Sequence, residues 1–586
     1  MMDALDRAIA NTQAHLDALR GAEGHWEGRL SSSALSTATA IVALTLVDRE
    51  KHAAHAADGA QWLCEHQNAD GGWGDTTLSK SNLSTTLLCW SALHLVGQKG
   101  SPAVQAANAC IAAQVGSLEP TDIARAVTAR YGKDKTFSVP ILMLCALCGT
   151  LGGEPWRHVM ALPFELAALP RTWFGAIGLP VVSYALPALI AIGYTRFKNA
   201  PPAWWNPLRW LRALTWPRIR PMLKMLQPSS GGYLEATPLT SFVTMALAGG
   251  GQLDHPCLPS AVEFLVNSKR EDGSWPIDTN LTTWGTTLSV RSSGFSPSDQ
   301  NGLKPELRTW LLAQQYREVH PFTNAPPGGW AWTDLPGGVP DADDSSSALI
   351  ALKKMGHACD AAIEQGVNWL LDLQNRDGGI PTFCRGWGTL PFDRSTPEIT
   401  AHALGAWWSW HDELPPVMQQ RIGRSTKAAL AYLKRVQSPD GSWIPLWFGN
   451  EHAVDENNPV YGTAQVVNHL SGGKVPGVED LLASGRRYLR GARKADGSFG
   501  GDAQAPSSIE ETAVALHALS GGGDDVRKSV EWLITATENG TRFPCSPIGL
   551  YFARLWYHEQ LYPVVWTLGA LRAATQSSLV PAEQGA

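Results

Sequence analysis

Residues 62–73 have the sequence WLCEHQNADGGW, a stretch that contains the repeated pattern on which the fold depends. A helix-like run ends in polar residues, an acid–glycine pair follows, and a large apolar side chain closes the turn. Six copies end at Trp26, Trp73, Trp275, Ile380, Trp443 and Phe499. An acid–glycine turn favours a positive φ at the glycine. The sequence therefore predicts a repeated unit in which the closing side chain folds back on the preceding helix.

A second helical run rich in Ala, Leu, Ser and Thr usually follows each copy, as at 83–95, 397–406 and 510–519. Repeated helix–turn–helix units without strand alternation indicate an all-α protein made of helical hairpins. The copies lie at irregular separations. This spacing favours barrels with insertions over an open, regular solenoid.

The composition limits the class of protein. The chain has 586 residues, of which 44% are hydrophobic and 17% are charged, against about 25% charged in an average globular protein. Its 25 tryptophans outnumber both its 14 phenylalanines and its 11 tyrosines, which excludes a disordered chain. The net charge of −6 gives no nucleic-acid footprint. The nine scattered cysteines are interpreted as reduced thiols of a cytosolic protein, and the charged first 20 residues are no secretory signal.

One region suggests contact with a membrane. Residues 172–195 carry no charge, but their prolines and glycines argue against a continuous spanning helix. Residues 203–226 then combine five cations and no acid with Trp204, Trp205, Trp210 and Trp216. Such a segment is typical of a helix that lies in a membrane interface. The alternative is a helix docked on the protein's own core, with a solvated basic edge.

The strongest chemical signal is the sequence Asp341-Ala342-Asp343-Asp344 at the start of an apolar helix. Three carboxylates in four residues repel one another, so in a desolvated pocket at least one keeps its proton and is a Brønsted acid. The alternative is an Asp N-cap on a surface helix. Trp330 and Trp332 lie just upstream, and aromatic faces stabilise cations without offering a nucleophile. An acid that faces tryptophans suits carbocation chemistry.

These motifs resemble those of a known family. The six turns resemble the QW motifs of squalene-hopene and oxidosqualene cyclases, and residues 341–344 resemble their DxDD protonation motif. The resemblance implies a class II terpene cyclase with two α/α-barrel domains. One barrel would comprise residues 1–20 and 290–586 and carry the acid site. The other, 21–289, would be an insertion with a membrane-facing segment at about 163–226.

The resemblance also implies roles for individual residues. Asp343 would be the proton donor, flanked by Asp341 and Asp344, with His402 as an imidazolium partner that keeps the donor acidic. The aromatic residues expected to line the substrate cavity are Trp284, Trp332, Phe383, Trp447, Tyr461, Tyr551, Phe552 and Tyr557. Taken singly, each aromatic is also explained by core packing, and His402 by a buried structural role. The resemblance implies neither a metal nor an organic cofactor.

Asp343 would thus protonate a terminal alkene of squalene and start cyclisation to a hopene-type triterpene, an isomerase reaction. The protein would act as a monotopic membrane protein on the cytoplasmic side, with a homodimer as a family expectation and no nucleic-acid partner. Ala185 stands where the family has Trp, and the run after GHWEGRL lacks the family's acidic residues, which leaves the product and termination open. The alternatives are a cyclase of another long polyprenyl substrate and a non-catalytic polyprenoid-binding barrel.

Overall fold

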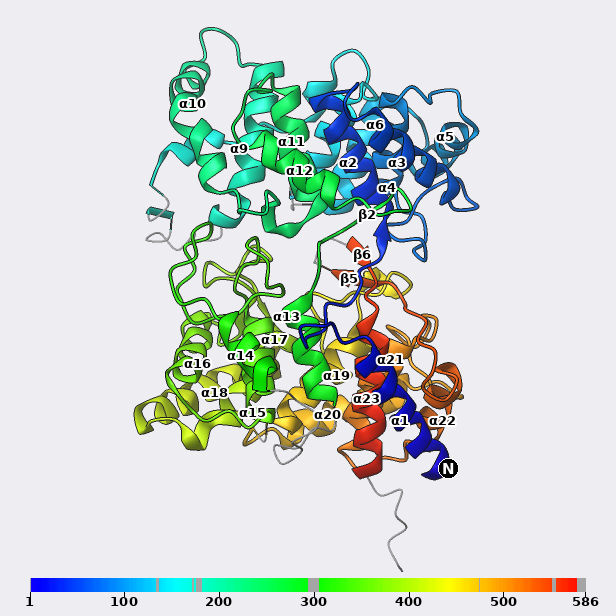
Figure 1. Ribbon diagram of the computed structural model, residues 1–586, viewed down its shortest axis with the longest axis vertical. Coiled ribbons are helices and arrows are strands. Elements are labelled where there is room, and N and C mark those ends of the chain that lie inside the picture. The colour runs from blue at the N-terminus through cyan, green and yellow to red at the C-terminus, as the bar shows by residue number, and fades with distance from the viewer. Residues whose placement is uncertain are drawn as a thin grey trace, which may run out of the picture.

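The computed structural model describes residues 2–132, 136–170, 173–174, 182–293, 305–473, 475–550 and 555–576, and it is predominantly α-helical, as predicted. Figure 1 shows two lobes stacked along the long axis. Short antiparallel strand pairs fasten connecting segments together: β1 (Ser32–Ser33) with β2 (Trp275–Pro276), β3 (Ile380–Pro381) with β4 (Ser395–Thr396), and β5 (Ile548–Leu550) with β6 (Leu555–Tyr557).

The lower lobe in Figure 1 is a closed ring of helices inside a second layer. Each inner helix contacts the next, and the last contacts the first; they are α13 (Thr282–Ser292), α15 (Ala342–Lys354), α17 (Pro397–Trp410), α19 (Pro459–Gly472), α21 (Ile509–Ser520) and α23 (Leu561–Gln576). The outer helices that cover them are α14 (Pro305–Ala313), α16 (Ala361–Leu373), α18 (Pro416–Val436), α20 (Glu479–Ala492), α22 (Arg527–Ala536) and α1 (Met2–Ala18). The inner helices are buried almost all round, whereas the outer ones bury one face.

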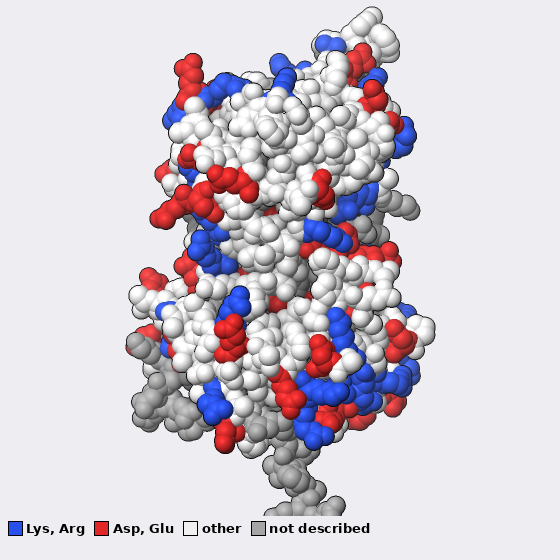
Figure 2. Space-filling model, turned by 90° about the vertical axis from the view of Figure 1, so that its right-hand side faces the viewer, with Lys and Arg blue, Asp and Glu red and all other residues white. Residues whose placement is uncertain are grey.

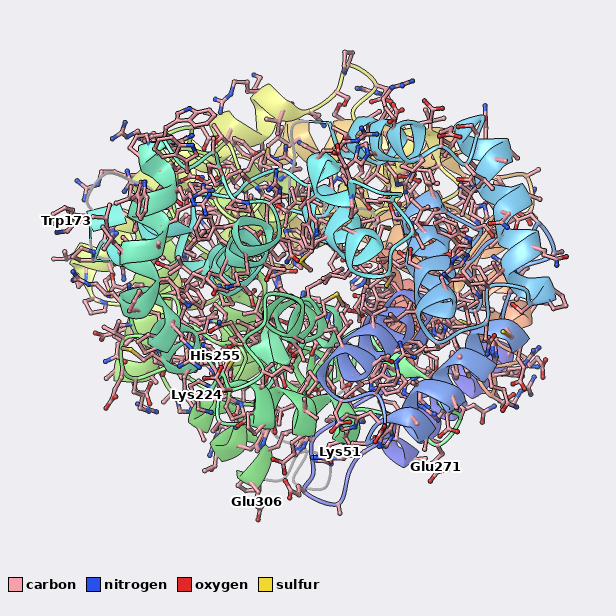
Figure 3. The ribbon with its side chains drawn as sticks, turned by 90° about the horizontal axis from the view of Figure 1, so that it is seen from above. Lys51, Trp173, Lys224, His255, Glu271 and Glu306 are labelled. Atoms are coloured by element: carbon pink, nitrogen blue, oxygen red, sulfur yellow. The ribbon has the colours of Figure 1, made fainter. Side chains whose placement is uncertain are left out.

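The upper lobe is a second ring, which Figure 3 shows from above. Its inner helices are α2 (Ala34–Val47), α4 (Leu83–Leu95), α7 (Ser138–Leu147), α9 (Val182–Asn199) and α11 (Thr237–Gly249). Its outer helices are α3 (Ala53–Glu65), α5 (Pro102–Val115), α6 (Pro120–Tyr131), α10 (Pro207–Met225) and α12 (Leu258–Asn267). The chain thus starts in the lower lobe with α1, builds the upper lobe, and returns to the lower lobe at α13.

The repeated turns have one common set of hydrogen bonds. At all six predicted copies the turn glycine has a φ between 80° and 96°. The backbone N–H of the closing residue donates to a threonine Oγ1 of an inner helix at 2.9–3.0 Å. Where the closing residue is tryptophan, its Nε1 also donates to the leucine carbonyl ten residues earlier, at 2.6–2.9 Å. Each turn therefore joins its own outer helix to an inner helix.

The structure contains two further copies of the turn that the sequence pattern did not identify. Tyr233 donates its hydroxyl to the Leu223 carbonyl and its N–H to Thr240, in a turn that has serine where the other copies have an acid. Trp330 donates its Nε1 to the Leu311 carbonyl at 2.8 Å. The indole of Trp330 therefore packs as a repeat tryptophan against the outer helices α14 and α16, and not toward the acid as expected.

The basic segment divides into an exposed part and a docked part. Trp204, Trp205 and Trp210 are 69%, 71% and 59% exposed at the start of α10. By contrast, Trp216 stacks on Tyr194 with ring centroids 3.6 Å apart, which fits the alternative of a helix docked on the protein's own core. Two cations of the segment are also paired within the protein: Arg212 with Glu165 at 2.9 Å, and Arg220 with Asp254 at 2.8 Å.

The surface reflects the low content of charge. Figure 2 looks at the side that carries α5 and α22, where charged side chains of both signs gather on the lower lobe and at the edges of the upper lobe. Within the described ranges, no helix has both the length and the apolarity needed to cross a bilayer.

Candidate active site

The acid cluster lies at the N-terminus of α15, inside the lower ring. Asp341 is the N-cap, since its Oδ1 accepts the backbone N–H groups of Asp343 and Asp344 at 2.9 Å each. Its own backbone pairs with Trp330, which fixes the entry of the chain into the helix. The N-cap interpretation therefore holds for Asp341, while the side chain of Asp343 remains available for other contacts.

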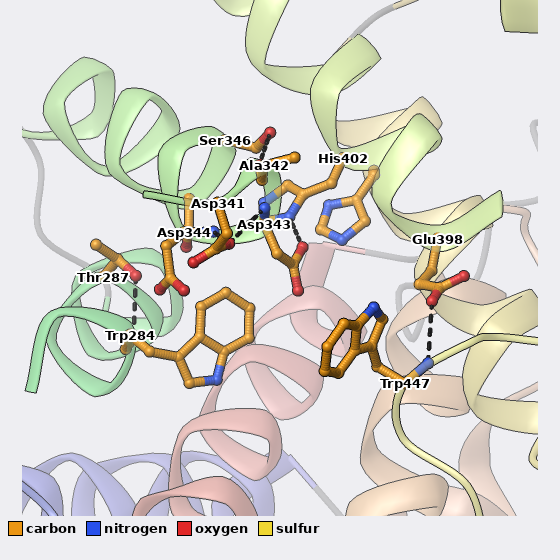
Figure 4. Close-up of polar contacts among 12 residues, drawn as sticks. Trp284, Thr287, Asp341, Ala342, Asp343, Asp344, Ser346, Glu398, His402 and Trp447 are labelled. Atoms are coloured by element: carbon orange, nitrogen blue, oxygen red, sulfur yellow. Dashed lines mark hydrogen bonds and ion pairs between the residues drawn. The ribbon is translucent and has the colours of Figure 1, made fainter. Parts of the chain in front are cut away.

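Asp343 pairs with His402 from α17. Asp343 Oδ1 lies 2.5 Å from His402 Nδ1, and the histidine side chain is fully buried. The side chain of Asp343 is 21% exposed, whereas Asp341 and Asp344 are almost completely covered. Figure 4 shows the Asp343 carboxyl turned toward the space between the indoles of Trp284 and Trp447. Of the three acids, Asp343 is the one whose carboxyl is partly exposed.

Burial keeps protons on this cluster near neutral pH. Desolvation raises the pKa of Asp343 to about 7, and the nearby Arg291 charge opposes that rise. Desolvation also raises the pKa of Asp341 to about 7 and lifts that of Asp344 well above its usual value, with repulsion from Asp341 adding to the latter. The predicted retention of a proton in the cluster is thus supported by its electrostatics.

The predicted imidazolium is not supported. Burial and the charge of Arg291 hold the pKa of His402 well below its usual value, so the ring is neutral. Arg291 Nη1 lies 2.9 Å from His402 Nε2, on the side of the ring away from Asp343. The positive charge behind the acid therefore belongs to Arg291, a residue that the sequence pattern did not single out. It lies seven residues after Trp284, two turns along one face of α13.

Four of the predicted aromatics lie close to the acid. Trp284 packs edge-to-face on His402, with centroids 6.4 Å apart. Phe383 lies between Trp332 and Trp447, at centroid distances of 6.5 and 6.0 Å. Trp447 Nε1 donates to Thr382 Oγ1 at 2.7 Å, which fixes the plane of the indole. Trp284 thus packs against the partner of the acid, and Trp332, Phe383 and Trp447 form a set of rings in contact with one another.

A second aromatic group lies against the first. Tyr557 and Tyr562 share a hydrogen bond of 2.5 Å, and the Trp284 Nε1 donates to the Tyr562 hydroxyl at 3.1 Å. Tyr461 stacks on Phe448 with centroids 4.7 Å apart. The predicted residues Tyr461 and Tyr557 are therefore joined by two that sequence reasoning missed, Tyr562 and Phe448. Tyr551 and Phe552 lie outside the described residues.

Glu398 is a further buried acid that the sequence reasoning missed. It lies one helical turn before His402 on α17 and accepts hydrogen bonds from the Thr396 hydroxyl and from the Leu446 N–H, the latter at 2.9 Å. Burial raises its pKa to about 7. The (i, i+4) spacing from His402 was the signal that could have identified it.

Comparison with known proteins agrees with this geometry. Residues 9–185 match the family model described as the squalene-hopene cyclase N-terminal domain, and residues 281–542 match that of the C-terminal domain. The squalene–hopene cyclase of Bradyrhizobium diazoefficiens is 23% identical over 97% of this chain and 95% of that protein. A terpene cyclase–glycosyl transferase fusion protein of Humicola fuscoatra is 24% identical over 90% of this chain, which spans 46% of that longer protein.

A solved structure has the same fold. The ent-copalyl diphosphate synthase from Streptomyces platensis superposes with a TM-score of 0.58 at 18% identity, over 98% of this chain and all of that one. The two family-model matches together span well over half of the chain, and they fall on the two rings that the structure contains. The chain therefore belongs to the squalene-hopene cyclase family of class II terpene cyclases.

Proposed function

We propose that this cyclase acts on squalene or a closely similar neutral polyprene and converts it to a hopene-type product. The observation that carries the proposal is the position of Asp343. It is the one partly exposed acid of its cluster, and its carboxyl is turned toward the space between Trp284 and Trp447. A carboxylic acid with a pKa near 7 in an apolar, aromatic environment can transfer its proton to an alkene held against it.

The proposed reaction balances without a cofactor. The terminal double bond takes the proton of Asp343 on its CH carbon, the π electrons form the new C–H bond, and a tertiary cation forms on the dimethyl carbon. Each following double bond then attacks the cation and closes a ring. The last cation loses a proton, which yields an isomer of the substrate, or it captures water, which yields an alcohol. Solvent returns a proton to Asp343.

The aromatic groups stabilise the moving cation. Trp284, Phe383 and Trp447 offer π-faces close to the acid, where the first rings would form. Tyr461 and Tyr557 belong to the second group and would stabilise later cations. These side chains also exclude water, which would otherwise quench the cation early.

The aromatic side chains around Asp343 favour a neutral hydrocarbon as substrate. A diphosphate would need cations or a metal ion at such a place. A polyprenyl diphosphate is nevertheless the second candidate, since the solved cyclase with this fold is named a copalyl diphosphate synthase.

Separate incubations test the substrate and the acid together. The folded protein is given squalene or geranylgeranyl diphosphate, and the extracted lipids are analysed by mass spectrometry. We expect squalene to be converted to ring-containing products. Asp343→Asn should lower the rate by about 10²- to 10⁴-fold, the contribution of a placed general acid. Asp360→Asn is the matched control, because Asp360 is an exposed N-cap of α16.

Other outcomes would overturn parts of the proposal. If squalene is left intact while the diphosphate is cyclised, the substrate class is wrong. If neither reacts and a polyprene remains bound through purification, the protein is a binding barrel. Full activity of the Asp343→Asn variant would contradict the role of the acid.

We further propose that the start of α10 rests on a membrane surface. Trp204, Trp205 and Trp210 are exposed there beside Leu214, which is also exposed, and indoles prefer the interface between lipid and water. Trp173, labelled in Figure 3, projects from the same side of the upper lobe.

A further inference from the structure

Arg291 contacts a cluster of polar side chains on the side of His402 that faces away from Asp343. Its Nη1 lies 2.9 Å from His402 Nε2 and donates to Ser347 Oγ at 3.1 Å, and its Nη2 lies 3.3 Å from His469 Nδ1. His402 and His469 stack with centroids 3.9 Å apart. The carboxylate whose charge acts most strongly on Arg291 is Asp343, beyond the imidazole of His402.

These contacts determine where the protons of His402 lie. A guanidinium only donates hydrogen bonds, so the Nε2 that faces Arg291 must be an unprotonated acceptor. A neutral imidazole then carries its single proton on Nδ1, the nitrogen that lies 2.5 Å from Asp343 Oδ1. His402 therefore donates to Asp343. An imidazolium would place two N–H groups face to face at 2.9 Å.

We propose that Arg291 is a positioning residue that holds His402 as the neutral Nδ1–H tautomer and thereby places the transferable proton on Oδ2 of Asp343. Oδ1 accepts from His402, which leaves Oδ2 to carry the proton, and this is the oxygen turned toward Trp284 and Trp447 in Figure 4. The inference rests on the proposed function of Asp343 as the acid. After proton transfer, the Nδ1–H and the fixed charge of Arg291 both stabilise the carboxylate.

The groups around Arg291 fit this role. Burial lowers the pKa of Arg291 to about 10, so it stays charged at neutral pH. Burial also holds the pKa of His469 on α19 well below its usual value. The side chain of His517 on α21 reaches the surface, and desolvation of its ring together with the charges of Arg291 and Lys354 lowers its pKa. On α15, Lys354 donates to the Arg291 carbonyl at 2.6 Å, and burial lowers its pKa to about 8. Burial raises the pKa of Tyr461 on α19 well above its usual value, so near pH 7 its neutral hydroxyl adds no charge beside Arg291. Near pH 7 the histidines around Arg291 are therefore neutral, whereas Arg291 itself is charged.

The first test observes the tautomer directly and requires no substrate. Protein labelled with ¹⁵N in histidine is compared with the His402→Asn variant, so that the signals lost identify His402. We expect a protonated Nδ1 and a bare Nε2 in the wild type and in Arg291→Lys, which still donates. In Arg291→Met we expect the Nε2 to become protonated. A wild-type ring with a protonated Nε2 would overturn the proposal even if the protein is an active cyclase.

The second test is a double-mutant cycle on kcat. Arg291→Met should lower kcat by about 10²-fold, the low end of a general acid's contribution, because His402 can then take the proton from Asp343. In the His402→Asn background the same change should lower kcat by only about tenfold, since the Asn amide takes no proton and only the charge of Arg291 is then lost. Equal losses in both backgrounds would mean a merely structural role. A wild type inactive on every polyprene would instead refute the proposed function.

Discussion

At the scale of single residues, the properties of the acid depend on neighbouring polar groups that make different contacts. Asp341 caps α15, Asp343 turns one carboxyl oxygen toward the space between Trp284 and Trp447, and the other oxygen of that carboxyl is hydrogen-bonded to His402 Nδ1. The pKa of Asp343 balances two effects: desolvation raises it to about 7, and Arg291 opposes the rise. The result is an acid that is protonated before the reaction yet has a stabilised conjugate base.

The pH dependence of turnover follows from this balance. In the proposed reaction only protonated Asp343 can start the cyclisation, and its pKa of about 7 is raised above the usual value. The active form therefore prevails below pH 7 and declines as the pH rises through that value. We expect kcat/KM to be highest near pH 6 and to fall about tenfold per unit above pH 8. Circular dichroism at each pH is the control for folding, and a rate that rises with pH would contradict this assignment.

The acid motif was predictable because it is local: four consecutive residues place the carboxyls on one helix start. The roles of Arg291 and Glu398 were not predictable, because their contacts form only when the helices pack. Arg291 on α13 reaches His402, and Glu398 on α17 accepts from the Leu446 N–H. The predicted positive charge on His402 is not supported, and the cause again lies in packing. A histidine beside a carboxylate favours an imidazolium, and only the structure reveals the guanidinium on its other side.

At the scale of elements, the repeated turn fastens the two layers of each ring. Its closing N–H binds an inner-helix threonine, and its glycine approaches the backbone of the next outer helix. At Gly441, for example, an added Cβ would lie 2.5 Å from the Ser484 carbonyl oxygen on α20. Six copies were predictable from the acid–glycine pair. The copies at Tyr233 and Trp330 were not, since the first lacks the acid and the second has a long insertion before its glycine.

Gly441→Ala tests the turn. Gly441 has a φ of +96°, and the new methyl would clash with backbone rather than with a movable side chain. We expect the unfolding free energy of the lower lobe to fall by about 2 kcal/mol or more, seen as a lower midpoint in thermal or denaturant unfolding. Gly423→Ala on α18 is the matched control, with nothing within 4 Å of the added methyl. It should stabilise the helix by about 0.5–1 kcal/mol. Equal effects of the two changes would refute the steric role of the turn.

At the scale of the whole molecule, the abundance of tryptophan separates into three structural settings. Repeat tryptophans such as Trp73 and Trp443 are buried in turns, Trp284 and Trp447 lie beside the acid, and Trp204 is exposed at the start of α10. The all-α class was predictable from helical periodicity. The closure of each lobe into a ring depends on contacts between distant helices such as α13 and α23. The irregular spacing of the repeats favoured barrels, whereas the division into two barrel domains entered the prediction through family resemblance.

The exposed tryptophans give a prediction for membrane binding. Replacing Trp204, Trp205 and Trp210 with serine should weaken cosedimentation with anionic liposomes by about tenfold or more, since each buried indole contributes on the order of 1 kcal/mol or more. Trp387→Ser is the matched control, because Trp387 is 62% exposed in the lower lobe. If the control weakens binding as much as the triple replacement, α10 is not the membrane face.

The most direct test of alkene protonation by Asp343 is a turnover experiment in D₂O with mass spectrometry and NMR of the product. Because the proton of Asp343 exchanges with solvent, each product molecule should carry one deuterium on the carbon that was the terminal alkene CH. The Asp343→Asn variant should form no such product. A cyclised product without deuterium at that carbon, or one formed equally well by Asp343→Asn, would contradict proton-initiated cyclisation at this site.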